Sequence, residues 1–437
     1  MKKIQTAIIV IALIIMIIII SIVIIKKNED NNKTSLENNI SNTVGNNSIE
    51  ENNIVQNDKL SRMEYTILNK AANTYIQTIN KNNSIYFDMN NDEINVKERN
   101  KYVLSLLSDS YINRNKINSN NLEEHIEFLE EQLFLVPIKM KRIKSENIKT
   151  YVIDGITINM NYNLKDEIRL IINIDYQNKT FSVEPTLDNY DEINNVDIVN
   201  NIEKMDNNEY TIKNINIENI VKEYMNNLKR MMLAKPELAY EHLDEEYRNK
   251  RFGSLDKFKE YIEKNKEEIK KMYIDKYLAN SFEDYSQYVG KDKYNNTYIF
   301  NEKDPLDYTI LLDTYTINSN EFKQAYDESK DEYRVKLNTD KWIKMLNNRD
   351  YENAYKCLDR KFREEKFGTE EEFEEYMREK FPLHYKLSVG ITEEVNGVYK
   401  QRIILQDITG ESNEQIENTI IMQLKDNYEF VMSFEVK

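Results

Sequence analysis

Apolar residues recur along this chain first at helical spacing and then at strand spacing, and this change of period occurs three times. Helical stripes begin near residues 67, 220 and 342. Each is followed by stretches in which apolar residues alternate with polar ones or run together, as in half-buried or buried strands. Examples are residues 150–160, 308–317 and 428–436. The pattern predicts an α+β chain of three tandem domains, each with helices followed by an antiparallel sheet.

A repeated segment defines the helical part of the second and third domains. Residues 239–262, AYEHLDEEYRNKRFGSLDKFKEYI, recur as 354–377, AYKCLDRKFREEKFGTEEEFEEYM, at a constant offset of 115 residues. A period of this length indicates repeated whole domains rather than a solenoid. The glycine of each Phe-Gly pair predicts a left-handed stop to one helix, and the serine or threonine after it predicts the cap of the next. Residues 107–126 have similar apolar spacing without Phe-Gly, which predicts a diverged third copy.

The amino-terminal region differs from the rest of the chain. Residues 4–25 form a charge-free, almost wholly apolar run of 22 residues, which is long enough to span a bilayer as a helix. Residues 28–57 contain 11 asparagines and no aromatic residue, a composition typical of a disordered linker. We therefore expect six segments: an anchor over 1–26, a linker over 27–59, domains over 60–187, 216–330 and 331–437, and a connector over 188–215.

Composition excludes several classes of function. The net charge of −16 gives no general attraction for nucleic acid. The only cysteine is Cys357, so neither an intrachain disulfide nor a cysteine-built zinc site is available. The three histidines, His125, His242 and His384, lack the spacing of a metal site, and no metal or cofactor is expected. The short tail before the anchor, the polar linker and the near absence of cysteine favour a body on the extracytoplasmic side of the cell membrane.

The order of helices before a sheet and the helix–Phe-Gly-Ser/Thr–helix motif resemble the cystatin-like α+β cones of the nuclear-transport-factor-2-like superfamily. This resemblance implies three cone domains, of which the first is the most diverged. With its anchor, the chain is also similar to uncharacterised anchored proteins of low-GC Firmicutes and to single-pass channel subunits of Gram-positive conjugation systems. Some enzymes of the superfamily use an aspartate in the cone, which makes Asp244 and Asp359 candidates. Their spacing to Arg248 and Arg363 also predicts helix-supporting ion pairs, and we favour this structural interpretation.

Two sets of side chains are candidate binding residues. Aromatic residues on the helical stripes can line a cone mouth or fill a core: Tyr240, Tyr247, Tyr261, Tyr355, Phe362 and Tyr376. Basic residues in the first domain can contact a polyanion or face solvent: Lys139, Lys141, Arg142 and Lys144.

These observations predict a non-catalytic, membrane-anchored extracytoplasmic scaffold or binding module of a cell-envelope assembly, with other envelope proteins as partners. One alternative is a sensor that holds a small ligand in one cone. A second is a conjugation-channel-like subunit, and the least favoured is an isomerase-like enzyme.

Overall fold

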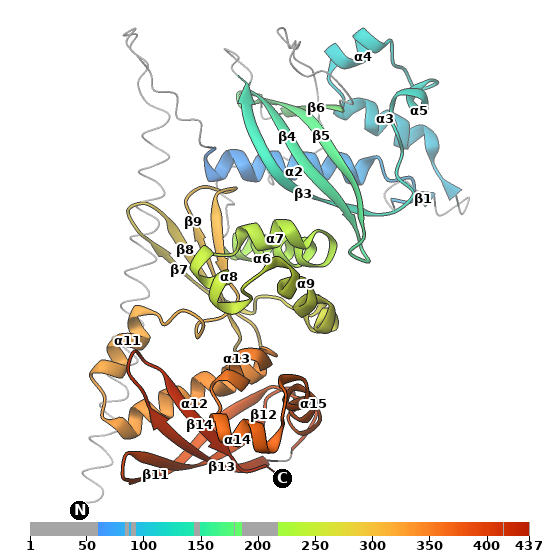
Figure 1. Ribbon diagram of the computed structural model, residues 1–437. Helices are drawn as coiled ribbons and strands as arrows, with labels where there is room; N and C mark the ends of the chain where they lie inside the picture. The colour runs from blue at the N-terminus through green and yellow to red at the C-terminus, as the bar shows by residue number, and fades with distance from the viewer. Residues whose placement is uncertain are drawn as a thin grey trace, which may run out of the picture. The chain divides into compact units, whose positions relative to one another are not determined.

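The computed structural model describes residues 60–83, 87–88, 93–143, 149–178, 180–185, 217–413 and 415–436. They form three units of similar design, in each of which helices precede a four-stranded antiparallel sheet (Figure 1). The predicted α+β class and helix-first order are thereby confirmed. The predicted anchor, linker and connector lie outside the described residues. Within the described residues, no helix combines the length and apolar character needed to cross a membrane.

The first unit opens with a long helix, which begins where Ser61 and Glu64 form a capping box. Its helices are α2 (Arg62–Thr78), α3 (Val96–Leu106), α4 (Asp109–Asn115) and α5 (Leu122–His125), and a short ribbon pairs β1 (Phe87–Asp88) with β2 (Glu93–Ile94). Its sheet has the order β3 (Leu133–Ile143), β4 (Lys149–Asn159), β5 (Leu164–Asp175) and β6 (Thr180–Pro185). The strand predicted over 150–160 is confirmed as β4, within one residue at each end.

The second unit repeats this plan. Its helices are α6 (Ile217–Ala234), α7 (Pro236–His242), α8 (Glu245–Arg251), α9 (Leu255–Lys264) and α10 (Lys266–Lys270). Its sheet consists of β7 (Lys276–Ser281), β8 (Ser286–Lys291), β9 (Thr297–Glu302) and β10 (Tyr308–Leu311), paired in sequence order. The strand predicted over 308–317 ends at Leu311. The Asp313 carboxylate accepts the backbone N–H groups of Tyr315 and Thr316 at 3.0 and 2.8 Å, which turns the chain away from the sheet.

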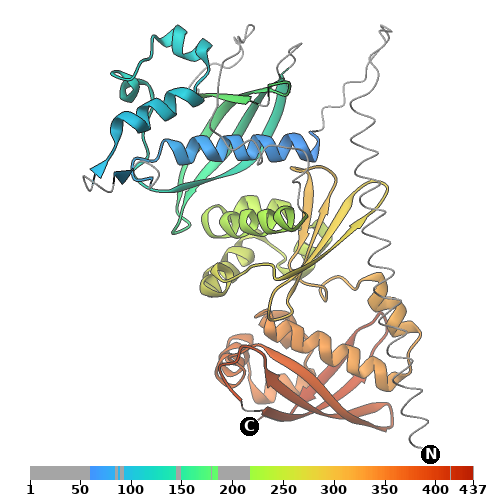
Figure 2. The same ribbon diagram turned by 180° about the vertical axis from the view of Figure 1, so that it is seen from behind.

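The third unit has the same order of elements. Its helices are α11 (Asn320–Asp327), α12 (Asp331–Asn347), α13 (Tyr351–Lys356), α14 (Arg360–Lys366) and α15 (Glu370–Lys380). Its strands are β11 (Tyr385–Val395), β12 (Val398–Asp407), β13 (Gln415–Leu424) and β14 (Phe430–Phe434). The long helix α12 packs along the sheet against β11 and β13, as Figure 2 shows from behind.

The repeated segment forms the same local structure in all three units. One leucine makes an isolated parallel bridge to the sheet of its own unit: Leu107 with Val183, Leu243 with Ile310, and Leu358 with Met432. The residue after each leucine caps the next helix with its side chain: Ser108, Asp244 and Asp359. The first unit is therefore a third copy of the segment, as its apolar spacing predicts.

The glycines of the Phe-Gly pairs have the predicted left-handed conformation, with φ of +74° at Gly253 and +71° at Gly368. In the first unit the left-handed residue is Lys116, with φ of +53°, and the buried apolar residue Ile117 follows it. In the Phe-Gly pairs the buried apolar residue comes before the left-handed residue, whereas in Lys116-Ile117 it comes after it. This reversal explains why Ile117 lies one position later in the repeat than Phe252.

Each unit has its own hydrophobic core, and the first two cores share residues at their junction. Val136, Ile156 and Ile158 belong to the first sheet but pack in the core of the second unit. This contact explains why β4 is buried on both faces along almost its whole length, and why its apolar residues do not simply alternate with polar ones.

Candidate functional site

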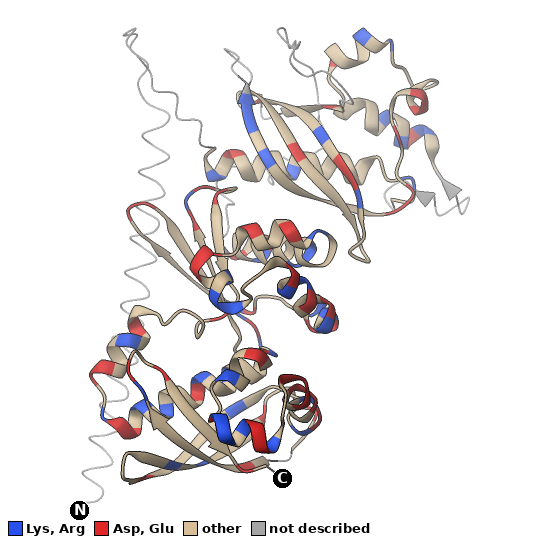
Figure 3. Cartoon of the chain, in the orientation of Figure 1, with Lys and Arg blue, Asp and Glu red and all other residues tan. Residues whose placement is uncertain are grey.

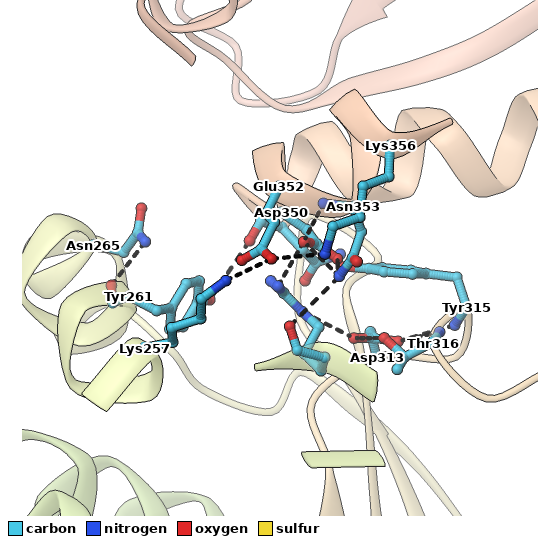
Figure 4. A network of polar contacts seen from close by, with 12 residues as sticks. Lys257, Tyr261, Asn265, Asp313, Tyr315, Thr316, Asp350, Glu352, Asn353 and Lys356 are labelled. Carbon is cyan, nitrogen blue, oxygen red and sulfur yellow. Dashed lines mark hydrogen bonds and ion pairs between the residues drawn. The ribbon is translucent and has the colours of Figure 1, made fainter. Parts of the chain in front are cut away.

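An arginine and two aspartates are buried together where the second and third units meet. The Arg251 Nη1 lies 2.6 Å from Asp350 Oδ1, and its Nε lies 3.7 Å from Asp313 Oδ2. The three side chains are 6%, 0% and 2% exposed, respectively. We call Arg251, Asp313 and Asp350 the ionic cluster (Figure 4). It is the most deeply buried set of charges joining these two units among the residues that the structure describes.

Local folding places each member of the ionic cluster. Arg251 ends α8, one turn after Tyr247, so both side chains lie on the inner face of that helix. Tyr247 donates its hydroxyl to Asp313 Oδ2 at 2.7 Å. Asp350 is the N-cap of α13 and accepts the backbone N–H of Asn353 at 3.3 Å and its side-chain amide at 3.0 Å. Each carboxylate therefore has hydrogen-bond donors besides Arg251.

The electrostatics of the ionic cluster favour a permanently charged arginine. Burial alone would lower the pKa of Arg251, but Asp350 and the surrounding tyrosines raise it well above its ordinary value. Moving these charges out of water has a large desolvation cost, which is offset only while the partners stay in contact. A closed junction in any other register would leave these charges buried without their partners, so the ionic cluster favours one arrangement of the two units.

A ring of weaker contacts surrounds the ionic cluster. Lys257 and Lys264 on α9 pair with Glu352 and Glu374 at 2.7 and 3.1 Å. Figure 3 shows acidic residues concentrated on α15, the helix that carries Glu374. Exposed ion pairs of this kind contribute about 0–1 kcal/mol each to stability. They therefore help to orient the two units more than they stabilise the junction.

A histidine packs into the same junction from the third unit. The ring of His384 stacks on Tyr294 of the second unit, with centroids 4.6 Å apart and an interplanar angle of 4°. Its side chain is buried, and burial together with the charge of Arg349 lowers its pKa to about 4. The ring is therefore neutral at physiological pH and acts as an apolar contact between the units.

Two cavities large enough to hold a small molecule lie at this junction. One of about 470 Å³ is lined by Tyr294, Tyr385 and a series of asparagines, including Asn296 and Asn347. The other, of about 320 Å³, is lined by lysines and by residues around the ionic cluster. Tyr315 lines both cavities. Volumes of this order are those of small-molecule sites.

The six predicted aromatic residues lie mainly in the cores. Tyr247 is fully buried, and ring neighbours within about 5.5 Å (centroid to centroid) occupy most of the others: Tyr240 with Phe258, Tyr355 with Phe373, Phe362 with Phe434, and Tyr261 with Phe252. Tyr376 contacts Phe367 at 5.4 Å. Tyr261 reaches the junction, where its hydroxyl donates to the Asn348 carbonyl at 3.5 Å. Their role in ligand binding stays a prediction.

The structure does not bring the predicted basic residues together as one surface. Lys139 and Lys141 are exposed on β3. Arg142 instead turns inward and donates to both carboxylate oxygens of Glu64 at 2.7 Å. Lys144 lies outside the described residues. The polyanion contact stays a prediction that rests on the two exposed lysines.

Asp244 and Asp359 have a different structural role from the one that their spacing predicts. Each carboxylate caps its helix, accepting the backbone N–H three residues later at 3.0 Å. Arg248 and Arg363 instead lie over the rings of Tyr240 and Tyr355, with 5.2 Å between each guanidinium carbon and ring centroid. The aspartate and the arginine each stabilise the repeat, but through separate partners rather than through one ion pair.

Sequence reasoning did not single out the ionic cluster, although the repeat contains a signal for it. The position of Arg251 is Lys366 in the next copy, and the position of Asp350 is Lys235 in the previous one. Such differences within an otherwise similar repeat indicate residues with a task specific to one unit.

In the part of the chain that the structure describes, no group of three or more His, Cys, Asp or Glu residues is arranged to hold a metal ion. The sequence matches no protein-family model, and comparison with curated proteins finds no similar chain. The function is therefore inferred from the residues and their geometry.

Proposed function

We propose that this chain is a non-catalytic scaffold or binding module of a cell-envelope assembly, anchored by residues 4–25 with its body outside the cell membrane. The apolar run and the asparagine-rich linker support the anchor and the location. We also propose that the three units are cystatin-like cones of the nuclear-transport-factor-2-like type. The common helix-first plan and the shared leucine bridge to the sheet support this finer assignment.

The observation that carries the scaffold proposal is the ionic cluster. A scaffold must present its binding surfaces at fixed relative positions. Tandem domains joined only by linkers move freely, whereas a buried, fully partnered charge cluster restricts the second and third units to one arrangement. The rigid pair would act as a single platform, held away from the bilayer by the linker.

The proposal is tested by crosslinking the tagged, full-length protein in its native cells and identifying what it captures. We expect a reproducible, small set of membrane or envelope proteins. Capture of the chain alone would overturn the proposal.

A matched pair of variants makes the experiment specific to the platform. Arg251→Met breaks the ionic cluster and should reduce capture. Lys366→Met changes the same repeat position in the third unit, where the side chain is exposed, and should leave capture unchanged. Equal capture by both variants would show that the rigid junction has no part in partner binding.

A further inference from the structure

We propose that the 320 Å³ cavity beside the ionic cluster binds a phosphate group, as a free monoester or within a small phosphodiester. The cavity lies between the second and third units. Three lysines converge on its lining, Lys250 from α8, Lys341 from α12 and Lys356 from α13. This proposal stands on the cavity alone and does not depend on where the chain resides in the cell.

The charges around the cavity favour an anion. Two acidic side chains, Asp350 and Glu429, also belong to its lining, but Asp350 is already paired with Arg251 at 2.6 Å. The lining therefore holds three lysines and two carboxylates, and two of the lysines, Lys250 and Lys356, also have acidic partners outside it. Lys341 is the lysine of this lining that has no carboxylate partner among the described residues, and a concave, partly desolvated site strengthens its effect on an anion.

Lys341 is the central donor of the proposed site. Lys250 and Lys356 pair with Glu246 and Glu352, each at 2.6 Å. Lys341 is more buried, and its Nζ donates to the amide oxygen of Asn318 at 3.0 Å. Within the described residues no carboxylate lies within ion-pair distance of it. An ammonium group has three donors and favours phosphate as a point-charge partner, so an anion would satisfy what the neutral amide does not.

A tyrosine hydroxyl supplies an independent sign that the cavity takes a polar ligand. The side chain of Tyr315 is 4% exposed, and its hydroxyl has no hydrogen-bond partner among the described residues. Figure 4 shows the ring extending from its loop toward Asp350 and Asn353, and both of these residues line the same cavity. A buried hydroxyl without a partner is costly, and a phosphate oxygen in the cavity would accept a hydrogen bond from it.

The size of the cavity limits the ligand. A volume of 320 Å³ exceeds that of a phosphate alone and is at the lower end of small-molecule sites, which span roughly 300–1,000 Å³. A phosphate with one or two small substituents, such as glycerol, matches this space.

The test is isothermal titration of the full-length protein in detergent micelles at near-physiological salt. Inorganic phosphate, glycerol phosphate and glycerophosphoglycerol are used as separate probes. Tighter binding of inorganic phosphate or glycerol phosphate would assign a free phosphate or phosphate monoester, and tighter binding of glycerophosphoglycerol would assign a phosphodiester source. Failure of all three probes to bind at millimolar concentration would overturn the proposal.

Three variants identify the site. Lys341→Met should weaken binding at least about 10-fold, because it removes a charge-assisted hydrogen bond. Tyr315→Phe removes only the hydroxyl and should weaken binding about 3- to 10-fold. Lys344→Met lies on the same helix, pairs with Asp340 at 2.8 Å and lines the other cavity, so it should bind like the wild type. Undiminished binding by Lys341→Met would place the anion elsewhere and refute the assignment.

Discussion

Replacing Arg251 with methionine tests whether the ionic cluster holds the second and third units together. Methionine keeps the apolar stem of the side chain and removes the charge. Asp350 and Asp313 would remain buried, with side chains 0% and 2% exposed, and without their cation. Removing one partner of a buried pair typically costs about 3–5 kcal/mol, because the other charge is left uncompensated. We expect the free energy of unfolding to fall by this amount.

The single tryptophan allows the loss of stability to be measured in the third unit alone. Trp342 is buried in α12 of the third unit, so its fluorescence reports unfolding of that unit, whereas far-ultraviolet circular dichroism reports all helices. In urea, the wild-type protein should show one transition for both signals over the second and third units. Arg251→Met should move the midpoint to lower urea and separate the two signals as the units uncouple.

Two controls determine whether the reasoning holds. Lys366→Met alters the exposed equivalent of Arg251 and should change stability by less than about 0.5 kcal/mol. Asp350→Asn keeps an effective N-cap on α13, because asparagine caps helices as well as aspartate does, but removes the charge that faces Arg251. It should therefore destabilise the junction without melting the helix. A loss below about 1 kcal/mol for Arg251→Met, with both signals still coincident, would refute the argument.

Other predictions follow from single residues. Asp350→Lys introduces the residue type that the second unit has at this repeat position, Lys235. It should cost more stability than Asp350→Asn in the same urea assay, since the new lysine would face Arg251. Hydrogen bonds and the charge of Arg142 outweigh burial and lower the pKa of Glu64 from 4.5 to about 2. The contribution of the Glu64 carboxylate to folding stability is therefore complete above pH 4.5 and is lost as the pH falls toward 2. The melting temperature of Glu64→Gln should depend less on pH in that window than the melting temperature of the wild type. His384 has its pKa lowered from 6.5 to about 4, so its stabilising contribution is present above pH 6.5 and is lost as the pH falls through 4. The melting temperature of His384→Phe should depend less on pH between 6.5 and 4 than that of the wild type. An unchanged slope of melting temperature against pH would show that the ring is not buried in solution. Gly253→Ala should cost about 1 kcal/mol in chemical unfolding, because φ of +74° is unfavourable for a residue with a Cβ atom, and a neutral effect would contradict the left-handed stop.

Local periodicity was enough to predict the fold class and most elements. The strands of the first unit are rich in apolar and β-branched residues, and the Phe-Gly-Ser/Thr motif encodes a helix stop and a cap in three adjacent residues. The elements that sequence reasoning missed have weaker patterns. Strand β8, SQYVGK, has small and polar residues at most positions and is defined by pairing with β7 and β9 on either side.

The candidate site was harder to predict because its partners are distant in sequence. Arg251 and Asp350 are brought together by the packing of two units, and no spacing rule along one helix relates them. Asp313 lies in an apolar run that favours a continued strand, yet its carboxylate ends the strand and joins the ionic cluster. Tyr247 was a candidate for its apolar stripe, and its structural importance comes instead from its hydroxyl bond to Asp313.

One repeat position is used at both junctions with opposite charge, and this suggests how the order of the units is specified. The N-cap position of α7 in the second unit is Lys235, which pairs with Glu167 in the sheet of the first unit. The same position in the third unit is Asp350, which pairs with Arg251 of the second unit. Exchanging the two units would set Asp350 against Glu167, and a second unit docked on another second unit would set Lys235 against Arg251. Like charges brought together in this way disfavour both wrong arrangements. Because an apolar junction between similar units would lack this discrimination, we infer that the charges at this repeat position favour the correct order of the units, and that the buried Arg251–Asp350 pair contributes more to it than the exposed Lys235–Glu167 pair.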